Sequence, residues 1–174
     1  MSSSSVDIHQ DRILILDFGS QYTQLIARRI RELGVYCEIR SSEITESQFE
    51  AFEPNGVVLS GGPESVTEEH TPRAPAYLFT KTVPVLGICY GEMTMCAQLG
   101  GEVVPTTERE FGRAFVDVME DCPLYEGIWQ PGEKYQVWMS HGDKIVQVPP
   151  GFRAVASSDS SPFAVITHEI KPFY

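Results

Sequence analysis

Apolar residues in the N-terminal half of the chain form short continuous runs that alternate with segments of helical spacing. The runs at residues 12–18, 35–39 and 56–60 have the length of strands and are bounded by turn-forming residues. Between the first two runs, apolar side chains recur at helical spacing over 21–33, and a shorter helix is predicted at 46–52. Continuous apolar strands are typical of a parallel sheet buried on both faces. The pattern therefore predicts a flavodoxin-like α/β fold, with a mostly parallel central sheet and helices on both faces.

The pattern changes in the second half of the chain. A helix is predicted at 71–80 with Pro72 at its first position, then a buried strand at 83–88 and a helix at 92–99 that ends at two glycines. Beyond residue 102, short runs alternate between apolar and polar residues, which is typical of strands with one solvated face. These runs predict an antiparallel β extension on the parallel core, with strands at 114–118, 135–139, 152–156 and 163–166.

The buried strand at 83–88 leads directly into a cysteine flanked by glycines. Gly87 and Gly91 stand two residues on either side of Cys89. Small residues are needed there when a sharp strand-to-helix turn, a nucleophile elbow, holds the nucleophile in a strained backbone conformation. A helix N-terminus favours a thiolate, and the backbone N–H of the next residue, Tyr90, can donate to an oxyanion. The spacing favours a catalytic nucleophile over the alternative, a small buried side chain at a strand end.

A pair of glycines, Gly61 and Gly62, follows the third predicted strand. In open α/β sheets, ligands bind beyond the carboxyl ends of the strands, so an exposed N–H of this pair could complete an oxyanion hole beside that of Tyr90. The alternative is an ordinary flexible turn. A phosphate-binding loop is set aside because the run 60–65 contains no lysine and matches neither common glycine-rich phosphate motif.

One polar cluster, Ser140-His141-Gly142-Asp143, follows the predicted strand at 135–139. A histidine beside an aspartate could be a catalytic base with the group that orients it. The other interpretation, which the sequence alone favours, is a turn that satisfies its own hydrogen bonds. Elsewhere, His168 is predicted to be a surface residue.

Composition indicates one soluble domain with a small substrate. The chain has 174 residues, of which 42% are hydrophobic, and we predict one domain over 12–174 after a serine-rich stretch at 1–11 that is disordered or an expression remnant. With 13 basic and 24 acidic residues, its formal charge of −11 opposes binding to nucleic acid.

The chain carries no sign of a membrane or metal function. Its apolar runs fall short of the ~20 residues that span a bilayer, and no signal-peptide pattern is present, so we expect a cytoplasmic protein without a membrane partner. The four cysteines form no C-x-x-C pair, so neither a zinc site nor a disulfide framework is predicted.

Four stretches of the chain, taken together, resemble the class I (triad-type) glutamine amidotransferases, and among these the amidotransferase domain of the GMP synthases. They lie at residues 15–29, 59–65, 87–91 and 138–143, in the family's order and spacing. The resemblance extends from about residue 12 to the end of the sequence.

The resemblance implies glutamine hydrolysis. Cys89 would attack the side-chain amide of glutamine, ammonia would leave, and the resulting thioester would be hydrolysed to glutamate. The family's oxyanion donors correspond to the backbone of Gly62 and Tyr90. Its substrate-binding positions correspond to Gly61, Ser140 and His141, so His141 is not implied as the base.

The resemblance also implies a partner. In the family, an ATP-pyrophosphatase (synthetase) domain of the same or a partner chain receives the ammonia and aminates XMP to GMP. ATP and Mg²⁺ belong to that domain, and neither a metal nor a cofactor is implied here.

The chain departs from the family at two places. Family members continue beyond Tyr174 into Gly-Val-Gln-Phe-His-Pro-Glu, which carries the catalytic histidine and its glutamate, so we expect a C-terminally incomplete domain of low activity. Where members have Met-Gln after the second elbow glycine, this chain has Glu92 and Met93. Glu92 either opposes the Cys89 thiolate by its charge or points to solvent as an ordinary residue of a helix N-terminus.

Three other functions stay open. A non-catalytic module that docks a synthetase partner would explain the missing histidine. The amidotransferase component of another biosynthetic enzyme, such as those of anthranilate or carbamoyl-phosphate synthesis, would share the elbow but match the stretch at 17–22 less well. A flavodoxin-like nucleotide-binding domain would suit the βαβαβ start and leave the elbow unexplained.

Overall fold

The computed structural model describes the backbone of residues 10–174 and, within that range, all side chains except those of residues 107–111 and 141. Most of the stretch at 1–11 therefore lies outside the described residues. The N-terminal half forms a four-stranded parallel sheet, made of β1 (Arg12–Asp17), β2 (Tyr36–Ser41), β3 (Gly56–Leu59) and β4 (Val85–Gly87). Its strand order is β2-β1-β3-β4, which is the order of a flavodoxin-like sheet.

Helices cover both faces of this sheet: α1 (Thr23–Glu32), α2 (Glu46–Phe52) and α3 (Tyr90–Gln98). Successive side chains of a strand point to opposite faces. Leu14 and Leu16 of β1 accordingly belong to the core that contains Met95 of α3, whereas Ile15 packs with Ala27 of α1 on the other side. No helix of the described chain is long and apolar enough to cross a membrane.

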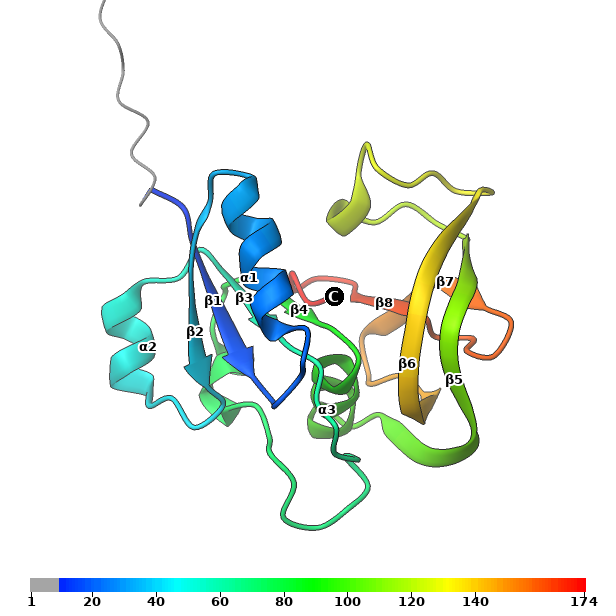
Figure 1. Ribbon diagram of the computed structural model, residues 1–174, viewed down its shortest axis with the longest axis horizontal. Helices are drawn as coiled ribbons and strands as arrows, with labels where there is room; N and C mark the ends of the chain where they lie inside the picture. The colour runs from blue at the N-terminus through cyan, green and yellow to red at the C-terminus, as the bar shows by residue number, and fades with distance from the viewer. Residues whose placement is uncertain (1–9) are drawn as a thin grey trace, which may run out of the picture.

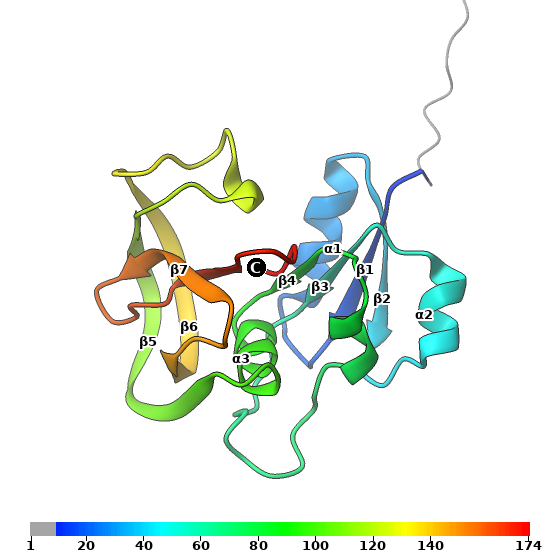
Figure 2. The ribbon, with the colours of Figure 1, turned by 180° about the vertical axis from the view of Figure 1, so that it is seen from behind.

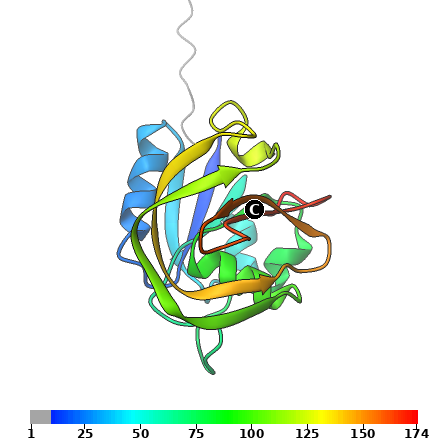
Figure 3. The same ribbon diagram turned by 90° about the vertical axis from the view of Figure 1, so that its right-hand side faces the viewer.

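The second half of the chain forms a separate antiparallel sheet, seen beside the parallel sheet in Figure 1 and from behind in Figure 2. Its strands are β5 (Glu102–Val118), β6 (Lys134–Gln147), β7 (Phe152–Ser158) and β8 (Val165–His168), in the order β6-β5-β7-β8. Figure 3 shows β5 and β6 bent into an arc. The predicted fold, a parallel core with an antiparallel extension, is confirmed.

Three element predictions differ from the structure. The strands predicted at 114–118 and 135–139 are only parts of β5 and β6, because the rest of each strand lacks a regular alternation of apolar and polar residues. The helix predicted at 71–80 is wrong, because only a short 3-10 helix, η1 (Ala76–Thr80), forms there. Pro75 explains this: it lacks an N–H and disfavours helical backbone in the residue before it, so a helix starting at Pro72 cannot continue. A further short 3-10 helix, η2 (Pro123–Tyr125), was not predicted.

The last three residues extend the parallel sheet. The Val85 N–H donates to the Pro172 carbonyl at 2.9 Å, the Tyr174 N–H donates to the Val85 carbonyl at 2.9 Å, and Val85 and Phe173 form a parallel bridge. The chain at Tyr174 therefore runs in the direction of β4, toward the sheet edge where the elbow lies.

His168 holds the turn before this segment. Its ring Nδ1 accepts hydrogen bonds from the backbone N–H groups of Ile170 and Lys171, both at 3.0 Å, and the ring packs edge-on against Phe152. The residue is half-buried, so the predicted surface position is only partly exposed. Sequence spacing gave no sign of this turn.

The start of α3 packs backbone to backbone against the end of β3. A Cβ atom at Gly91 would lie 2.2 Å from the Leu59 carbonyl oxygen, and one at Gly87 would lie 2.6 Å from the Glu92 backbone nitrogen. Real side chains do not approach so closely. Both elbow glycines are therefore required by packing.

Gly91→Ala tests this packing. We expect it to lower the free energy of unfolding by at least ~1–3 kcal/mol, because the added methyl group meets a strand carbonyl that cannot move aside. Gly142→Ala is the matched control, since a Cβ there would meet nothing within 4 Å. Urea unfolding of both variants measures the difference. Equal stability of the two would contradict the close approach.

Candidate active site

Cys89 occupies a strained turn between β4 and α3. Its backbone angles are φ 56° and ψ −113°, and it is the residue immediately before the helix. A non-glycine residue at positive φ is uncommon and is typical of functional sites held in place by their surroundings. Here Ile88 donates its N–H to Leu59 at 2.9 Å, and Gly91 donates to Ile88 at 3.0 Å. The sharp turn predicted from the glycine spacing is present.

The thiol of Cys89 is half-buried, and its S–H donates to the Ser140 carbonyl oxygen at 3.2 Å. Burial, the largest influence, raises the pKa of the thiol above its ordinary value. The backbone N–H of Tyr90 acts in the opposite direction, and the carboxyl groups of Glu92 and Asp143 add to the rise. The thiol is therefore protonated at neutral pH, and attack by it requires a proton acceptor.

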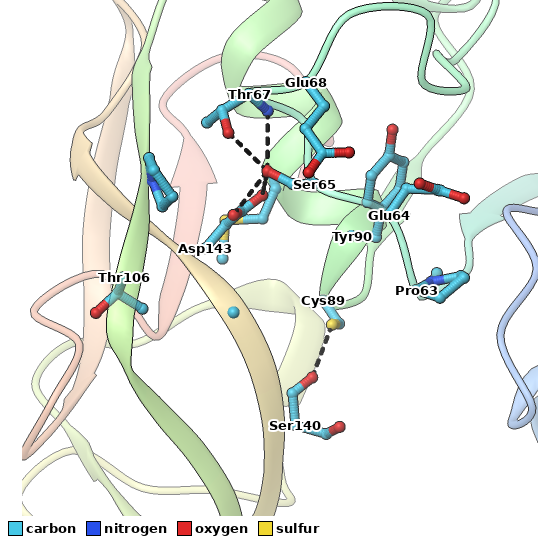
Figure 4. A pocket seen from close by; sticks show the side chains of 14 residues that line it. Pro63, Glu64, Ser65, Thr67, Glu68, Cys89, Tyr90, Thr106, Ser140 and Asp143 are labelled. Carbon is cyan, nitrogen blue, oxygen red and sulfur yellow. Dashed lines mark hydrogen bonds between the residues drawn. The ribbon is translucent and has the colours of Figure 1, made fainter.

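Cys89 lies on the wall of a cavity of about 620 Å³, which we call the front cavity (Figure 4). This volume is in the range of ~300–1,000 Å³ that is typical of small-molecule sites. One wall is the loop after β3, the other comes from β5 and β6, and the start of α3 lies between them. The lining residues used below are Gly62, Ser65, Cys89, Tyr90, Met93, Ser140 and Asp143.

A second cavity of about 350 Å³, the apolar cavity, also borders Cys89. Its lining is mostly apolar and includes Ile88, Leu124, Trp129, Val137, Trp138, Phe163 and Tyr174. Cys89, Met93 and Ser140 line both cavities. The nucleophile candidate is therefore reached from a polar side and from an apolar side.

Asp143 joins the two walls of the front cavity. Its carboxylate accepts the Ser65 hydroxyl at 2.9 Å and the Val66 backbone N–H at 2.9 Å (Figure 4). Asp143 is buried, so these bonds are made away from competing water. They fix the loop after β3 against β6, at the strand position three residues after Ser140.

Tyr90 is held on its own side of the cavity. Its hydroxyl donates to the Pro72 carbonyl at 2.5 Å and accepts from Arg73 Nη1 at 3.0 Å. Arg73 Nη2 in turn donates to the Val66 carbonyl at 2.6 Å. The irregular segment before η1, where a helix was predicted, thus positions both the loop and the residue after the cysteine.

The structure brings most of the predicted site residues together. Gly62, Tyr90 and Ser140 line the front cavity with Cys89. A side chain at Gly62 would start 2.5 Å from the Phe18 carbonyl oxygen, so only glycine fits. Gly61 lies behind Cys89, where its Cβ would be 3.6 Å from that of the cysteine, and it is not among the residues that line the cavity. Their catalytic and binding roles stay predictions.

Two other predicted positions, His141 and Glu92, differ from these. The side chain of His141 lies outside the described residues. Glu92 is half-buried and lines the apolar cavity, and burial raises its pKa to about 8, so of the two alternatives left open for it the solvent-facing one is wrong. Its neighbour Met93, where the family has glutamine, lines both cavities.

The sequence did not reveal Ser65 and Arg73 as parts of the site. Their partners are far along the chain, 78 residues for Ser65 and 17 for the Tyr90 hydroxyl, and no local motif marks such pairs. Asp143 was considered only as the orienting group of His141.

The strain at Cys89 can be measured by replacing it. We expect Cys89→Gly to be more stable than Cys89→Ala by about 1 kcal/mol, because relief of ~1–3 kcal/mol of backbone strain exceeds the ~0.4–1 kcal/mol entropic cost of glycine. At Gln136, an exposed residue of β6, the same comparison should reverse, with glycine the less stable. Urea unfolding of the four variants gives both differences. A less stable Cys89→Gly would exclude the strain.

Comparison with known proteins agrees with this geometry. The chain is 57% identical over 173 residues to a GMP synthase (glutamine-hydrolyzing) of Bradyrhizobium sp. strain ORS 278, covering 99% of this chain and 32% of the relative. It is 54% identical over 170 residues to the protein of the same name from Brucella melitensis biotype 1, covering 98% of this chain and 34% of the relative. The chain thus spans about one third of the length of these curated relatives.

The fold has close solved counterparts. A protein described as a GMP synthase subunit from Thermoplasma acidophilum superposes with a TM-score of 0.81 at 31% identity, covering 94% of this chain and 81% of its own. The family model of Glutamine amidotransferase class-I matches residues 14–174. The chain belongs to the class I glutamine amidotransferases.

Proposed function

We propose that this chain is the glutamine-hydrolysing domain of a GMP synthase. The observation that carries the proposal is Cys89 in a strained turn, on the wall of a cavity that Gly62 and Tyr90 also line. The two curated relatives bear the name GMP synthase (glutamine-hydrolyzing), which supports this choice over the amidotransferase of another pathway.

The proposed reaction proceeds through a thioester. Cys89 Sγ attacks the side-chain amide carbon of glutamine, and the oxyanion that forms accepts hydrogen bonds from the backbone N–H groups of Gly62 and Tyr90. The C–N bond then breaks, the leaving nitrogen takes a proton, and ammonia departs. Water hydrolyses the thioester to glutamate and returns the thiol. The α-amino-acid end of glutamine lies against Gly61, Ser140 and His141.

A proton acceptor is needed because burial keeps the Cys89 thiol neutral. In this proposal it is the histidine of the Gly-Val-Gln-Phe-His-Pro-Glu segment that follows the Phe-Tyr pair in the family. The chain at Tyr174 runs parallel to β4 and toward the elbow, and the apolar cavity is bordered by both Cys89 and Tyr174. This cavity offers the segment a place beside the thiol.

The wider assignments belong to the same proposal. Ammonia passes to an ATP-pyrophosphatase (synthetase) domain, of the same or a partner chain, which uses ATP and Mg²⁺ to aminate XMP. The glutamine-hydrolysing domain itself uses neither a metal nor a cofactor, and the location is cytoplasmic.

Glutamate release tests the proposed reaction. We expect the 174-residue chain to hydrolyse glutamine slowly and the addition of Gly-Val-Gln-Phe-His-Pro-Glu to raise the rate by ~10²–10⁴-fold, since general acid–base assistance is worth about that much. The matched control carries the same extension with alanine in place of its histidine.

Two outcomes would contradict the reaction. The first is an extended chain in which Cys89→Ala keeps its glutaminase activity. The second is a rate in the unextended chain that matches the extended one. An extended chain that binds a synthetase domain and never releases glutamate would favour the non-catalytic module instead.

A synthetase domain should dock beside the elbow, because ammonia released into water near neutral pH is protonated and lost as a nucleophile. Ile88 and Trp138, which border the apolar cavity next to Cys89, keep 36% and 77% of their surface exposed. Exposed aromatic and aliphatic side chains of this kind are typical of interface cores.

Hydrogen exchange tests the docking face. With an added synthetase domain of a relative, we expect slower exchange of the amides around Ile88 and along β6 near Trp138, and unchanged exchange in α2 on the far edge of the sheet. Protection confined to α2 and β2 would exclude the proposed face. Trp138→Ala should weaken binding at least ~5-fold, whereas Leu33→Ala, at an exposed position of the α1 C-terminus, should not.

A further inference from the structure

Glu92 is a half-buried titratable group that the proposed reaction does not use. It is the third residue of α3, and its backbone nitrogen packs against Gly87, two residues before the nucleophile. Its side chain lines the apolar cavity together with Cys89 and Met93. The close packing at Gly87 therefore fixes where this side chain starts.

The carboxyl group of Glu92 has no partner in the described part of the chain. No described residue donates a hydrogen bond to it or forms an ion pair with it, and burial alone raises its pKa, to about 8. A carboxylate in such surroundings is costly, because nothing replaces the water that it loses. The neutral acid is therefore the form that the folded chain favours at physiological pH.

We propose that Glu92 is a positioning residue for the ionisation of Cys89: its neutral carboxyl group leaves the thiolate unopposed, and its ionised form opposes the thiolate across the wall of the apolar cavity. This inference refines the proposed function, since it concerns the same nucleophile. It differs from the ordinary role of an acidic residue at a helix N-terminus, which would favour the charged form of Glu92.

The titratable groups around Glu92 support this coupling. Cys89, immediately before α3, and Cys96, within it, both have their pKa values raised in part by the charge of Glu92. From β6, Asp143 adds to the same effect on Cys89, and from the C-terminal segment Tyr174 lines the cavity as a neutral phenol. Among the described residues that line the apolar cavity, none is a lysine, arginine or histidine.

The pH dependence of Cys89 alkylation by iodoacetamide tests the proposal on the chain as it is. Below pH 7, where Glu92 is neutral, we expect Glu92→Gln and the unmodified chain to react at the same rate. Near pH 9, where Glu92 is ionised, Glu92→Gln should react about three- to tenfold faster, which corresponds to a pKa of Cys89 lower by up to about one unit. Mass spectrometry of the Cys89 peptide separates its labelling from that of the buried cysteines.

The control variants separate charge from structure. Glu102→Gln makes the same change at an exposed position outside both cavities and should leave the profile unchanged. Glu92→Met, which restores the family's residue, should behave like Glu92→Gln above pH 8 despite its different shape. A disturbed elbow would instead change the rate equally at every pH, and that result would overturn the proposal.

Stability against pH gives a second readout. The pKa of Glu92 is raised from 4.5 to about 8, so between these values the folded state holds one proton more than the unfolded state. The contribution of this group to stability therefore falls as pH rises through that window and is constant above it. Glu92→Gln should remove this fall. Between pH 5 and pH 8, the slope of the unfolding free energy against pH should change by the amount that corresponds to about one proton per molecule.

The outcomes distinguish this inference from the proposed function. Identical alkylation and stability profiles for Glu92→Gln and the unmodified chain would overturn the role of Glu92, and glutamine hydrolysis by the extended chain would still stand. Divergent profiles in a chain whose extended form never releases glutamate would support the coupling and refute the glutaminase function.

Discussion

The contact between the Gly91 backbone and the Leu59 carbonyl is the constraint on which the site depends. Because α3 starts against the end of β3, the chain has no room for a gradual turn between β4 and the helix. The reversal is completed at a single residue, Cys89, which takes a positive φ. The thiol is thereby directed at both cavities, and the Tyr90 N–H lies beside it. The backbone strain at Cys89, its position at the N-terminus of α3 and the neighbouring Tyr90 N–H donor thus all follow from one close approach of two backbones.

Much of the parallel half could be predicted from the sequence because its information is local. The strands at 12–18 and 56–60 are continuous apolar runs, and the helix at 46–52 has a capping box in which Thr45 and Gln48 satisfy each other's backbone. The helix at 71–80 was wrongly predicted because Pro72 was taken as its first residue, although Pro75 follows three residues later. The long strands β5 and β6 failed because pairing partners, rather than their own residue pattern, determine their outer ends.

Some features of the candidate site could likewise be predicted from local sequence, and others could not. The elbow was predicted because Gly87, Cys89 and Gly91 lie within five residues of one another. The bonds from Ser65 and Val66 to Asp143 join segments more than 70 residues apart, and each residue taken alone has a common, unremarkable explanation. Glu92 shows the same limit: its spacing from Cys89 was visible, but whether it faced water or a cavity depended on residues contributed by β6 and the C-terminal segment.

Two opposing influences act on the pKa of the Cys89 thiol, and their balance bears on the roles of the two cavities. The helix N-terminus and the Tyr90 N–H favour the thiolate, yet burial is the larger influence and keeps the thiol protonated. A preformed thiolate in this fold would require more water at the elbow, and water would weaken the hydrogen bonds on which oxyanion stabilisation depends. A neutral thiol avoids this conflict if a proton acceptor arrives from the side away from the substrate. In the proposed reaction the front cavity would then hold the amino-acid substrate while the proton is taken up from the apolar cavity, and Cys89, Met93 and Ser140 line both cavities.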